Sequence, residues 1–493
     1  MERLILTPDG LLLEDVAHAM RKSCQLELSE AARREIQASR EFLEGKIYDQ
    51  EKIIYGVNTG FGSLCNVSIE PEKLGNLQVN LIRSHAAGMG AEVPVELVRL
   101  MLLLKIQNFC YGKSGVRLEL VERLIEFYNA DILPVLYTQG SLGASGDLAP
   151  LAHLSLPLIG EGKCHWKGKH VESKEILEEL GWTPVELQAK EGLALLNGTQ
   201  FSTAYAAWSV LEAENLLRKA NMCAALSMEA FNVQLSPLHE QVHAIRKQRG
   251  QIAAAKDIRV WLEGSDLSER PGKPVQDPYS FRCVPQVHGA SGAALEHVRS
   301  VVQAELNAVT DNPNVLQDYD EILSAGNFHA QPIALVLDYL GIALSELSNI
   351  SERRTYQLIS GQRGLPAYLI DSAGLHSGMM IAQYTAASIV SQNKQLCSPA
   401  SVDSIVSSLG QEDHVSMSAN AGVKTRDIVE NVWSVLGVEF LTACQAWSFR
   451  KEKLSDRLHS IYLQFRDRVP VLKEDRIQHD DMMAAARFIR ELE

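Results

Sequence analysis

One segment, residues 201–231, constrains the fold more than any other part of the sequence. It runs for 31 residues without Gly or Pro and holds five charged residues, which are Glu212, Glu214, Arg218, Lys219 and Glu229. A helix of this length that is apolar around most of its circumference must be buried on several sides, as in the middle of a bundle. The segment therefore predicts a long central helix in a mainly α protein.

Other helical patterns surround this segment, and no linker, repeat or low-complexity tract separates them. In the first half they cover residues 29–44, 70–84, 93–110 and 117–128, with a hairpin around Lys163–Val171. In the second half they cover residues 294–310, 332–360, 373–395 and 424–450. We therefore expect an N-terminal domain, residues 1–195, with many loops, and a C-terminal bundle of long helices, residues 196–493.

The overall charge excludes one large class of function. The chain carries 47 Lys and Arg against 61 Asp and Glu, a net charge of −14, whereas nucleic-acid binding needs clustered positive charge. No signal-peptide pattern opens the sequence, and charges such as Lys105, Asp338 and Glu439 interrupt its apolar stretches. The eight cysteines include no CxxC pair, which is typical of reduced thiols. We expect a cytoplasmic protein.

A candidate metal site lies at His239–His243, whose sequence HEQVH fits the HExxH pattern. On a helix the two histidines would share one face, Glu240 could act as a base, and Glu263 could be a third zinc ligand. Pro237, just upstream, favours an ordinary exposed helix start instead. The pattern leaves both interpretations open.

A glycine-rich segment, residues 140–150, has the sequence GSLGASGDLAP. A serine-hydrolase elbow would need Gly where Asp147 stands, and a phosphate loop would need a following Gly-Lys-[Ser/Thr], which is missing. The segment is then a tight turn that leads into a helix, with Asp147 as the N-cap and Pro150 in the first turn.

A further chemistry is open to Ala144, Ser145 and Gly146 within this turn. If the turn presses the Gly146 nitrogen onto the Ala144 carbonyl carbon, a ring closes, and the loss of two waters turns Ser145 into an exocyclic methylene. The product is 4-methylidene-imidazol-5-one (MIO), an electrophile made without an external cofactor. Small residues permit the bend, and Ser supplies the leaving hydroxyl. The same letters, GASG, recur at residues 289–292 before an expected helix start.

Six blocks of sequence, taken in order, resemble the aromatic amino acid ammonia-lyase family. They are Tyr55–Gly60 (YGVNTG), Gly143–His153 (GASGDLAPLAH), Leu195–Gln200 (LLNGTQ), Gln276–Arg282 (QDPYSFR), Gly326–His329 (GNFH) and Gln411–Ser416 (QEDHVS). The resemblance implies a carbon–nitrogen lyase with the all-helical architecture of ammonia-lyases and fumarases. It also implies an MIO group from Ala144, Ser145 and Gly146, a mere helix start at residues 290–292, and no metal at His239–His243.

The resemblance implies roles for the remaining site residues. Tyr55 would take the β-proton; an unperturbed phenol titrates near pH ~10, so its surroundings must lower its pKa or the enzyme works in alkaline solution. Tyr279 would lie beside the ring, Asn197 would bind the ring oxygen or the substrate carboxylate, and Arg282 would hold that carboxylate bidentately. The implied substrate-binding residues are Ser84, His85, Asn197, Gln276, Arg282, Phe328 and Glu412.

Two positions indicate the substrate within the family. Members that act on phenylalanine or tyrosine have Phe-Leu or His-Leu where this chain has Ser84-His85, and phenyl-specific members have an amide in place of Glu412. Because a polar ring is costly to desolvate in an apolar pocket, these side chains favour imidazole. The resemblance implies conversion of L-histidine to trans-urocanate, the first step of histidine degradation. Gln331, where Glu is usual, removes one charge near the pocket.

Members of the family are homotetramers whose sites draw on three subunits, which implies that the bundle forms the core of an oligomer. Three alternatives remain at this point. They are a tyrosine or phenylalanine lyase or aminomutase of the same family, a zinc peptidase that uses His239, His243 and Glu263, and a catalytically silent helical scaffold.

Overall fold

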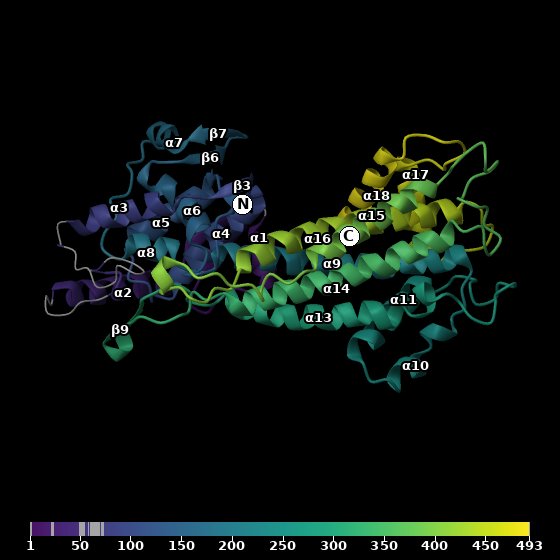
Figure 1. The fold of residues 1–493 in the computed structure, drawn as a ribbon, viewed down its shortest axis with the longest axis horizontal. Helices are drawn as coiled ribbons and strands as arrows, with labels where there is room; N and C mark the ends of the chain where they lie inside the picture. The colour runs from purple at the N-terminus through teal and green to yellow at the C-terminus, as the bar shows by residue number, and fades with distance from the viewer. Residues whose placement is uncertain are drawn as a thin grey trace. The chain divides into compact units, whose positions relative to one another are not determined.

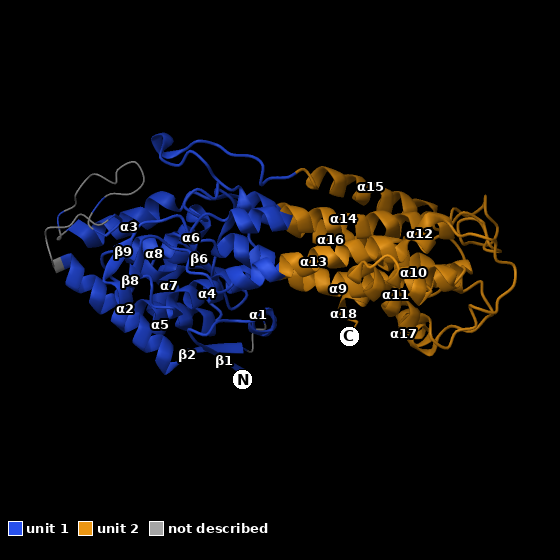
Figure 2. Ribbon diagram, turned by 90° about the horizontal axis from the view of Figure 1, so that it is seen from below, with its two compact units in different colours: residues 1–208, 300–337, 399–423 blue, residues 209–299, 338–398, 424–493 orange. Residues whose placement is uncertain are grey.

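A computed structural model describes residues 2–20, 24–48, 55–57, 59, 70 and 73–492 of the chain. Its contacts divide the chain into two compact units, shown in blue and orange in Figure 2. Unit 1 comprises residues 1–208, 300–337 and 399–423, and unit 2 comprises residues 209–299, 338–398 and 424–493. The division is not a single cut in the chain, and residue 195 lies inside unit 1, because two later segments pack against the N-terminal part.

Helices dominate the chain, as the sequence predicts. The helices wholly in unit 1 are α1 (Leu13–Ala19), α2 (Glu30–Tyr48), α3 (Leu74–His85), α4 (Val95–Cys110), α5 (Leu118–Asn129), α6 (Leu148–Ser155), α7 (Ser173–Leu180) and α8 (Glu191–Leu196). The expected helices at residues 29–44, 70–84, 93–110 and 117–128 correspond to α2, α3, α4 and α5. The buried face of α5 shows the usual spacing, with Leu120, Val121, Leu124 and Tyr128 turned inward.

The strands among the described residues are short and all belong to unit 1. They are β1 (Glu2–Leu6), β2 (Cys24–Leu28), β3 (Met89–Glu92), β4 (Leu133–Pro134), β5 (Tyr137–Gln139), β6 (Lys163–Trp166), β7 (Lys169–Glu172), β8 (Asn314–Leu316) and β9 (Glu321–Leu323). Strands β1 and β2 pair in parallel, whereas β3 with β5, β4 with β6, β6 with β7, and β8 with β9 pair antiparallel. The predicted hairpin is confirmed as β6–β7.

Four long helices have residues in both units, and six shorter helices lie wholly in unit 2. The long helices are α9 (Gln200–Phe231), α13 (Val284–Glu305), α14 (Gln331–Leu358) and α16 (Ser418–Trp447). The shorter ones are α10 (Glu240–Ala244), α11 (Arg249–Leu262), α12 (Tyr279–Arg282), α15 (Met380–Leu396), α17 (Asp456–Arg468) and α18 (His479–Glu491). Within unit 2 the four long helices lie side by side (Figures 1 and 2).

The core of unit 2 explains how α9 buries charged residues. Arg354 of α14 and Glu439 of α16 are both fully buried and joined by a 2.8 Å Nη2–Oε2 contact, and Ser227 of α9 donates its hydroxyl to Glu439. Glu229 of α9 pairs with Arg270 at 2.6 Å. Since a buried charge is tolerated when it is paired, these contacts allow α9 to be the central helix that its sequence predicts.

The repeated GASG at residues 289–292 lies inside α13, so the predicted helix start there is wrong. Gly289 packs against α11 so closely that an added Cβ would lie 2.3 Å from the backbone nitrogen of Gln251. Ser291 is buried and donates its hydroxyl to the carbonyl of Ala343 at 2.7 Å. The small residues serve helix packing here, because the two helices approach too closely for larger side chains.

One described helix, α14, is long and apolar enough to cross a membrane by length and composition alone. In the structure 72% of its most apolar window is buried within the protein, as in the core helix of a soluble protein. Seven cysteines lie among the described residues; none forms a disulfide, and five are buried. Burial raises the pKa of the Cys110, Cys164 and Cys444 thiols to about 12, so they are protonated at neutral pH.

Candidate active site

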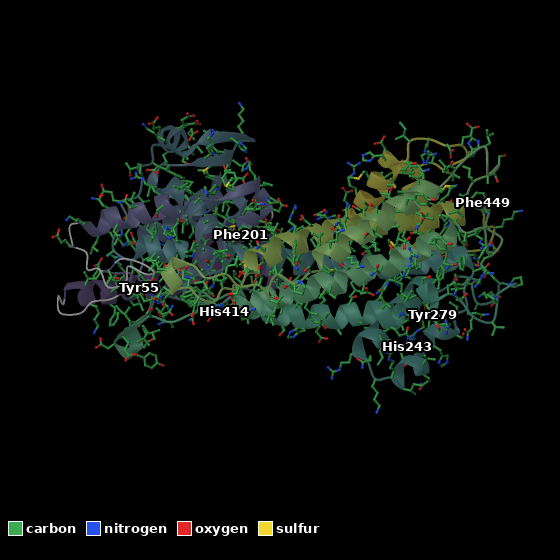
Figure 3. All side chains as sticks on the ribbon, viewed as in Figure 1. Tyr55, Phe201, His243, Tyr279, His414 and Phe449 are labelled. Atoms are coloured by element: carbon green, nitrogen blue, oxygen red, sulfur yellow. The ribbon has the colours of Figure 1, made fainter. Side chains whose placement is uncertain are left out.

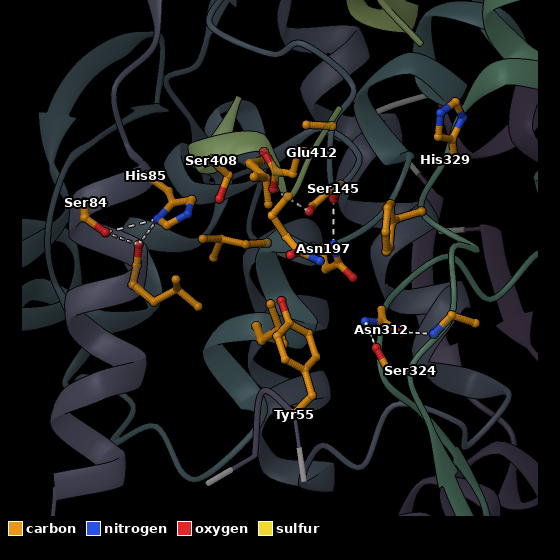
Figure 4. A pocket seen from close by; sticks show the side chains of 18 of the residues that line it. Tyr55, Ser84, His85, Ser145, Asn197, Asn312, Ser324, His329, Ser408 and Glu412 are labelled. Carbon is orange, nitrogen blue, oxygen red and sulfur yellow. Dashed lines mark hydrogen bonds between the residues drawn. The ribbon is translucent and has the colours of Figure 1, made fainter. Parts of the chain in front are cut away.

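Unit 1 contains a cavity of about 1030 Å³ that gathers residues from distant parts of the sequence (Figure 4). Tyr55 and the last turns of α3 line it, together with the glycine-rich loop and Asn197. Two later segments, residues 312–329 and 408–414, complete the lining. The lining residues predicted from the sequence are Tyr55, Ser84, His85, Ala144, Ser145, Asn197, Phe328 and Glu412.

The loop at residues 143–147 bends sharply and is held by its neighbours. Gly146 has a φ of 77°, and a Cβ there would lie 2.1 Å from the carbonyl oxygen of Gly198, so only glycine fits. On the other side Ala144 packs in an apolar cluster with Val415 and Met417. The backbone nitrogen of Met417 donates to the carbonyl of Leu142 at 3.0 Å. The bend is therefore fixed by two other segments of unit 1.

Asp147 is the N-cap residue of α6, as predicted, but its side chain makes no capping hydrogen bond to that helix. Its fully buried carboxylate accepts hydrogen bonds from the Ser202 nitrogen at 2.8 Å, the Ser202 hydroxyl at 2.9 Å and the Ser141 hydroxyl at 3.2 Å. Burial raises the pKa of Asp147 to about 6, and these hydrogen bonds oppose the rise. Asp147 thus caps the first turn of α9 and anchors the loop to it.

Asn197 follows α8 and contacts the loop directly. Its Nδ2 donates to the Ser145 carbonyl oxygen at 2.6 Å, while its Oδ1 is buried and has no hydrogen-bond partner in the structure. The ammonium of Lys105 donates hydrogen bonds to the backbone carbonyl oxygens of Asn197, at 2.9 Å, and Ala194, at 3.1 Å. A cation at the C-terminal end of α8 satisfies carbonyls that the helix leaves unpaired.

The buried Lys105 makes a testable contribution to stability. Burial lowers its pKa from 10.5 to about 7, against the opposing effect of Asp311. Between these values the unfolded chain binds more protons than the folded chain, so the free energy of unfolding rises with pH. Lys105→Met should remove up to about 1.4 kcal/mol of that rise per pH unit, measured by urea denaturation. Lys451→Met, at an exposed position, should keep the wild-type slope, and an unchanged slope for Lys105→Met would contradict the assignment.

His85 is the last residue of α3, and its ring has a defined hydrogen-bond pattern. Its Nδ1 lies 2.9 Å from the carbonyl oxygen of Leu81, which can only accept, so Nδ1 carries the hydrogen. Burial lowers the pKa of His85, whereas the Leu81 carbonyl and the Glu412 carboxylate oppose this effect. The neutral ring therefore keeps Nε2 as an acceptor.

Glu412 belongs to the segment that closes another side of the cavity. Its Oε1 accepts a hydrogen bond from the Ser145 hydroxyl at 3.1 Å, and its Oε2 accepts one from Ser407 at 2.8 Å. Figure 4 shows Glu412 above Ser145, and His85 on the same side of the cavity. A carboxylate and a neutral imidazole thus line the same polar end.

Tyr55 lies on the side of the cavity opposite Glu412, and its hydroxyl points into the cavity that Ser145 and Asn197 line (Figure 4). Gly56, which follows it, donates its backbone nitrogen to the Thr59 hydroxyl at 3.1 Å. Asn58 and Gly60, the other residues of the YGVNTG block apart from Val57, lie outside the described residues.

The sequence analysis missed a pair of histidines and an asparagine in the lining. His329 and His414 stack with ring centroids 5.5 Å apart, and their Nε2 and Nδ1 atoms lie 3.3 Å apart. Asn312 bonds to Ser324 and to the Ala325 nitrogen, which fixes the turn beside Phe328. Both histidines stand in the sequence blocks GNFH and QEDHVS, so the signal was present without an assigned role.

Three predicted site residues, Gln276, Tyr279 and Arg282, belong to unit 2 and do not line this cavity. They lie on and just before the short helix α12, where Gln276 and Tyr279 are exposed (Tyr279 by 70%). The Arg282 guanidinium carbon lies 4.5 Å from the Tyr279 ring centroid, and its Nε is buried with no hydrogen-bond partner in the structure. Tyr279, labelled in Figure 3, thus presents its ring on the surface of unit 2.

Three other residues that the sequence singles out have structural roles. Gln331 is not among the lining residues; it begins α14 and donates its amide to the Ser401 carbonyl at 3.1 Å. His239 caps α10 by accepting from the Gln241 nitrogen, and the buried His243 bonds to Gln251 at 2.9 Å. The two histidines of the HExxH pattern therefore each make a hydrogen bond that stabilises this short helix or its contact with α11.

Comparisons with known proteins agree over nearly the whole chain. The profile of the aromatic amino acid lyase family matches residues 11–467. The histidine ammonia-lyase of Symbiobacterium thermophilum is 46% identical, over 97% of this chain and 95% of that protein. The crystal structure of histidine ammonia-lyase from Trypanosoma cruzi matches with a TM-score of 0.92 at 39% identity, over 99% of this chain and 93% of that one. Pantoea agglomerans phenylalanine aminomutase matches with a TM-score of 0.95 at 31% identity, over 99% of each chain.

Proposed function

Because the chain belongs to the aromatic amino acid lyase family, we propose that it eliminates ammonia from L-histidine to give trans-urocanate. It is a carbon–nitrogen lyase, and this reaction would be the first step of histidine degradation in the cytoplasm. One observation carries the choice of substrate. The cavity that holds the Ala144–Gly146 loop has a neutral histidine, His85, and a carboxylate, Glu412, at one end.

The loop residues fit the formation of an MIO group. Cyclisation joins the Gly146 nitrogen to the Ala144 carbonyl carbon, and the Ala144 oxygen and the Ser145 hydroxyl leave as two waters. The Ser145 carbonyl oxygen is retained as the carbonyl oxygen attached to the ring, and this is the atom to which Asn197 donates at 2.6 Å. Once formed, the group supplies an electrophile that turns the amine of the substrate into a better leaving group.

The chain's own residues would orient the substrate and move its proton. The Nε2 of His85 accepts a hydrogen bond from the imidazole N–H of the substrate. Glu412 accepts one from the second ring N–H when that ring is protonated, or from the single N–H when the neutral ring is rotated toward it. Tyr55, across the cavity, takes the β-proton as its phenolate. Arg282 holds the substrate carboxylate with its guanidinium fork, and Tyr279 supplies a second hydroxyl.

In this proposal Gln276, Tyr279 and Arg282 of unit 2 act in the active site of a different subunit. We propose a homotetramer in which Gln276, Tyr279 and Arg282 of one chain complete a cavity formed by another. Support comes from the exposure of Gln276 and Tyr279 on unit 2, because these side chains are open to another chain and do not line the cavity of unit 1. Each cavity would then be complete only in the assembly.

A direct assay tests the substrate. Pure protein is mixed with L-histidine, without added cofactor or metal, and the ultraviolet absorbance of urocanate is followed. A steady rise with L-histidine, and none with L-tyrosine or L-phenylalanine, is expected. The reverse pattern would favour the alternative function, that of a tyrosine or phenylalanine lyase or aminomutase. The similarity to the Pantoea phenylalanine aminomutase is the observation that favours this alternative.

The variant His85→Leu tests the polar end of the cavity. It leaves an N–H of the substrate ring unpaired, at a cost of ~1–3 kcal/mol, so kcat/KM for L-histidine should fall by roughly 10–10²-fold. Intact mass should still report the loss of two waters, because the hydrogen bonds of the His85 ring are to Ser84 and Leu81 of its own helix. The matched variant His459→Ala, at an exposed position of α17, should keep full turnover. An unchanged kcat/KM for His85→Leu would rule out the assigned role.

A further inference from the structure

Three side chains outside the cavity, those of Glu92, His165 and His170, converge on unit 1. The Nε2 atoms of both histidines lie 3.3 Å from Oε2 of Glu92, and the histidine rings are 4.2 Å apart between centroids. One ligand atom from each residue lies within 4.8 Å of the other two. Among the residues that the structure describes, no other three His, Cys, Asp or Glu side chains gather in this way.

The backbone accounts for this convergence. In the β6–β7 hairpin His165 and His170 are direct cross-strand partners, so their side chains leave the same face. The turn uses Lys167 and Gly168 with φ values of 50° and 77°, which is the two-residue turn that fixes such a register. Glu92 ends β3, and the next nitrogen, that of Val93, donates to the Leu136 carbonyl at 2.9 Å. The residue before Leu136, Val135, donates its backbone nitrogen to the carbonyl of Lys163, at the base of the hairpin.

The spacing suits a small tetrahedral cation. Bonds of ~2.1 Å from Zn²⁺ to histidine nitrogen and carboxylate oxygen separate the ligand atoms by ~3.4 Å. We propose that Glu92, His165 and His170 form a binding site for a divalent transition-metal ion such as Zn²⁺. The ligands are Nε2 of each histidine and one carboxylate oxygen, and water completes the coordination.

The exposure of the site agrees with this proposal. The three side chains are between 27% and 47% exposed, so an ion in solution can reach them. A bound ion would replace the hydrogen bonds between the imidazoles and Glu92 by stronger bonds. It would also join β3 to a hairpin about 70 residues further along the chain.

The consequence is a metal-dependent gain in the stability of unit 1 that leaves the cavity untouched. None of the three residues lines the cavity, so turnover of L-histidine should not depend on the ion. Metal binding at this site can therefore be tested independently of the proposed lyase activity.

The test uses full-length protein that has been stripped with a chelator and dialysed. Zn²⁺ is titrated in competition with a chromogenic chelator, for the wild type and for the variants Glu92→Gln, His165→Ala and His170→Ala. Compared with the wild type, each variant should bind one fewer Zn²⁺ ion per chain with high affinity, or should bind that ion at least ~10-fold more weakly. His459→Ala, a surface histidine of unit 2, should bind as the wild type does.

A second measurement guards against variants that fold poorly. Zn²⁺ should raise the midpoint of thermal unfolding of the wild type and of His459→Ala, but not of His170→Ala, while all three have equal midpoints without metal. Co²⁺ should give the visible spectrum of a four- or five-coordinate site in the wild type and in His459→Ala, but not in His170→Ala. Equal Zn²⁺ stoichiometry and affinity in wild type and His170→Ala would overturn the proposal, whatever the turnover.

Discussion

Ser145→Ala is expected to abolish the mass deficit of two waters and, with it, turnover of L-histidine. The alanine side chain has no hydroxyl to lose, so the exocyclic methylene cannot form even where the loop bends as before. Loss of the covalent catalytic group should lower kcat by at least about 10³-fold, the scale on which removal of a nucleophile disables other enzymes. Intact-mass spectrometry and the urocanate assay on the same sample measure the two effects.

Ser291→Ala is the matched control, because Ser291 stands in an identical GASG sequence. It lies inside α13, where its hydroxyl bonds to Ala343 and its backbone is helical. We expect this variant to keep both the mass deficit and turnover, and to lose only about 1 kcal/mol of stability with its hydrogen bond. A mass deficit that persists in Ser145→Ala, or that disappears in Ser291→Ala, would show that the MIO group does not form at Ala144–Gly146.

Two inactive variants, Tyr55→Phe and Tyr279→Phe, are expected to restore activity to each other when they assemble together. Tyr55 lines the cavity of unit 1, whereas Tyr279 is exposed on unit 2. If one chain supplies Tyr55 and another supplies Tyr279 to each site, random assembly of equal amounts leaves roughly a quarter of the sites intact. Co-expression with two different tags, followed by tandem purification and the urocanate assay, measures this fraction.

The control replaces Tyr279→Phe by a chain that carries both substitutions. Mixed with Tyr55→Phe, this double variant offers no chain with an intact Tyr55, so no activity should return. If mixed assemblies of the two single variants stay as inactive as the parent proteins, both tyrosines act from the same chain. The mass deficit should persist in every combination, because neither tyrosine belongs to the cyclising residues.

The helices follow from the sequence where side-chain patterning decides them. The stretch without Gly or Pro at residues 201–231 became α9, residues 200–231, because an apolar helix of that length has no alternative to burial. The α13 start was placed ten residues too late, at residue 294 instead of Val284. Gly289 and Gly292 suggested a break, but their missing side chains make room for close neighbours, and helix packing offsets their low helix propensity.

The sequence by itself showed that Ala144, Ser145 and Gly146 have the residue types that an MIO group needs, and the family resemblance distinguished them from the identical letters at residues 289–292. The same resemblance, through Ser84, His85 and Glu412, predicted a polar end of the cavity. Only the tertiary structure decided which side chains meet. Asp147 caps α9 instead of its own helix, Asn197 reaches the Ser145 carbonyl, and Tyr279 falls in the other unit. The physical reason is that local pattern fixes helices and turns, whereas contacts between residues far apart in the chain depend on how buried surfaces fit together.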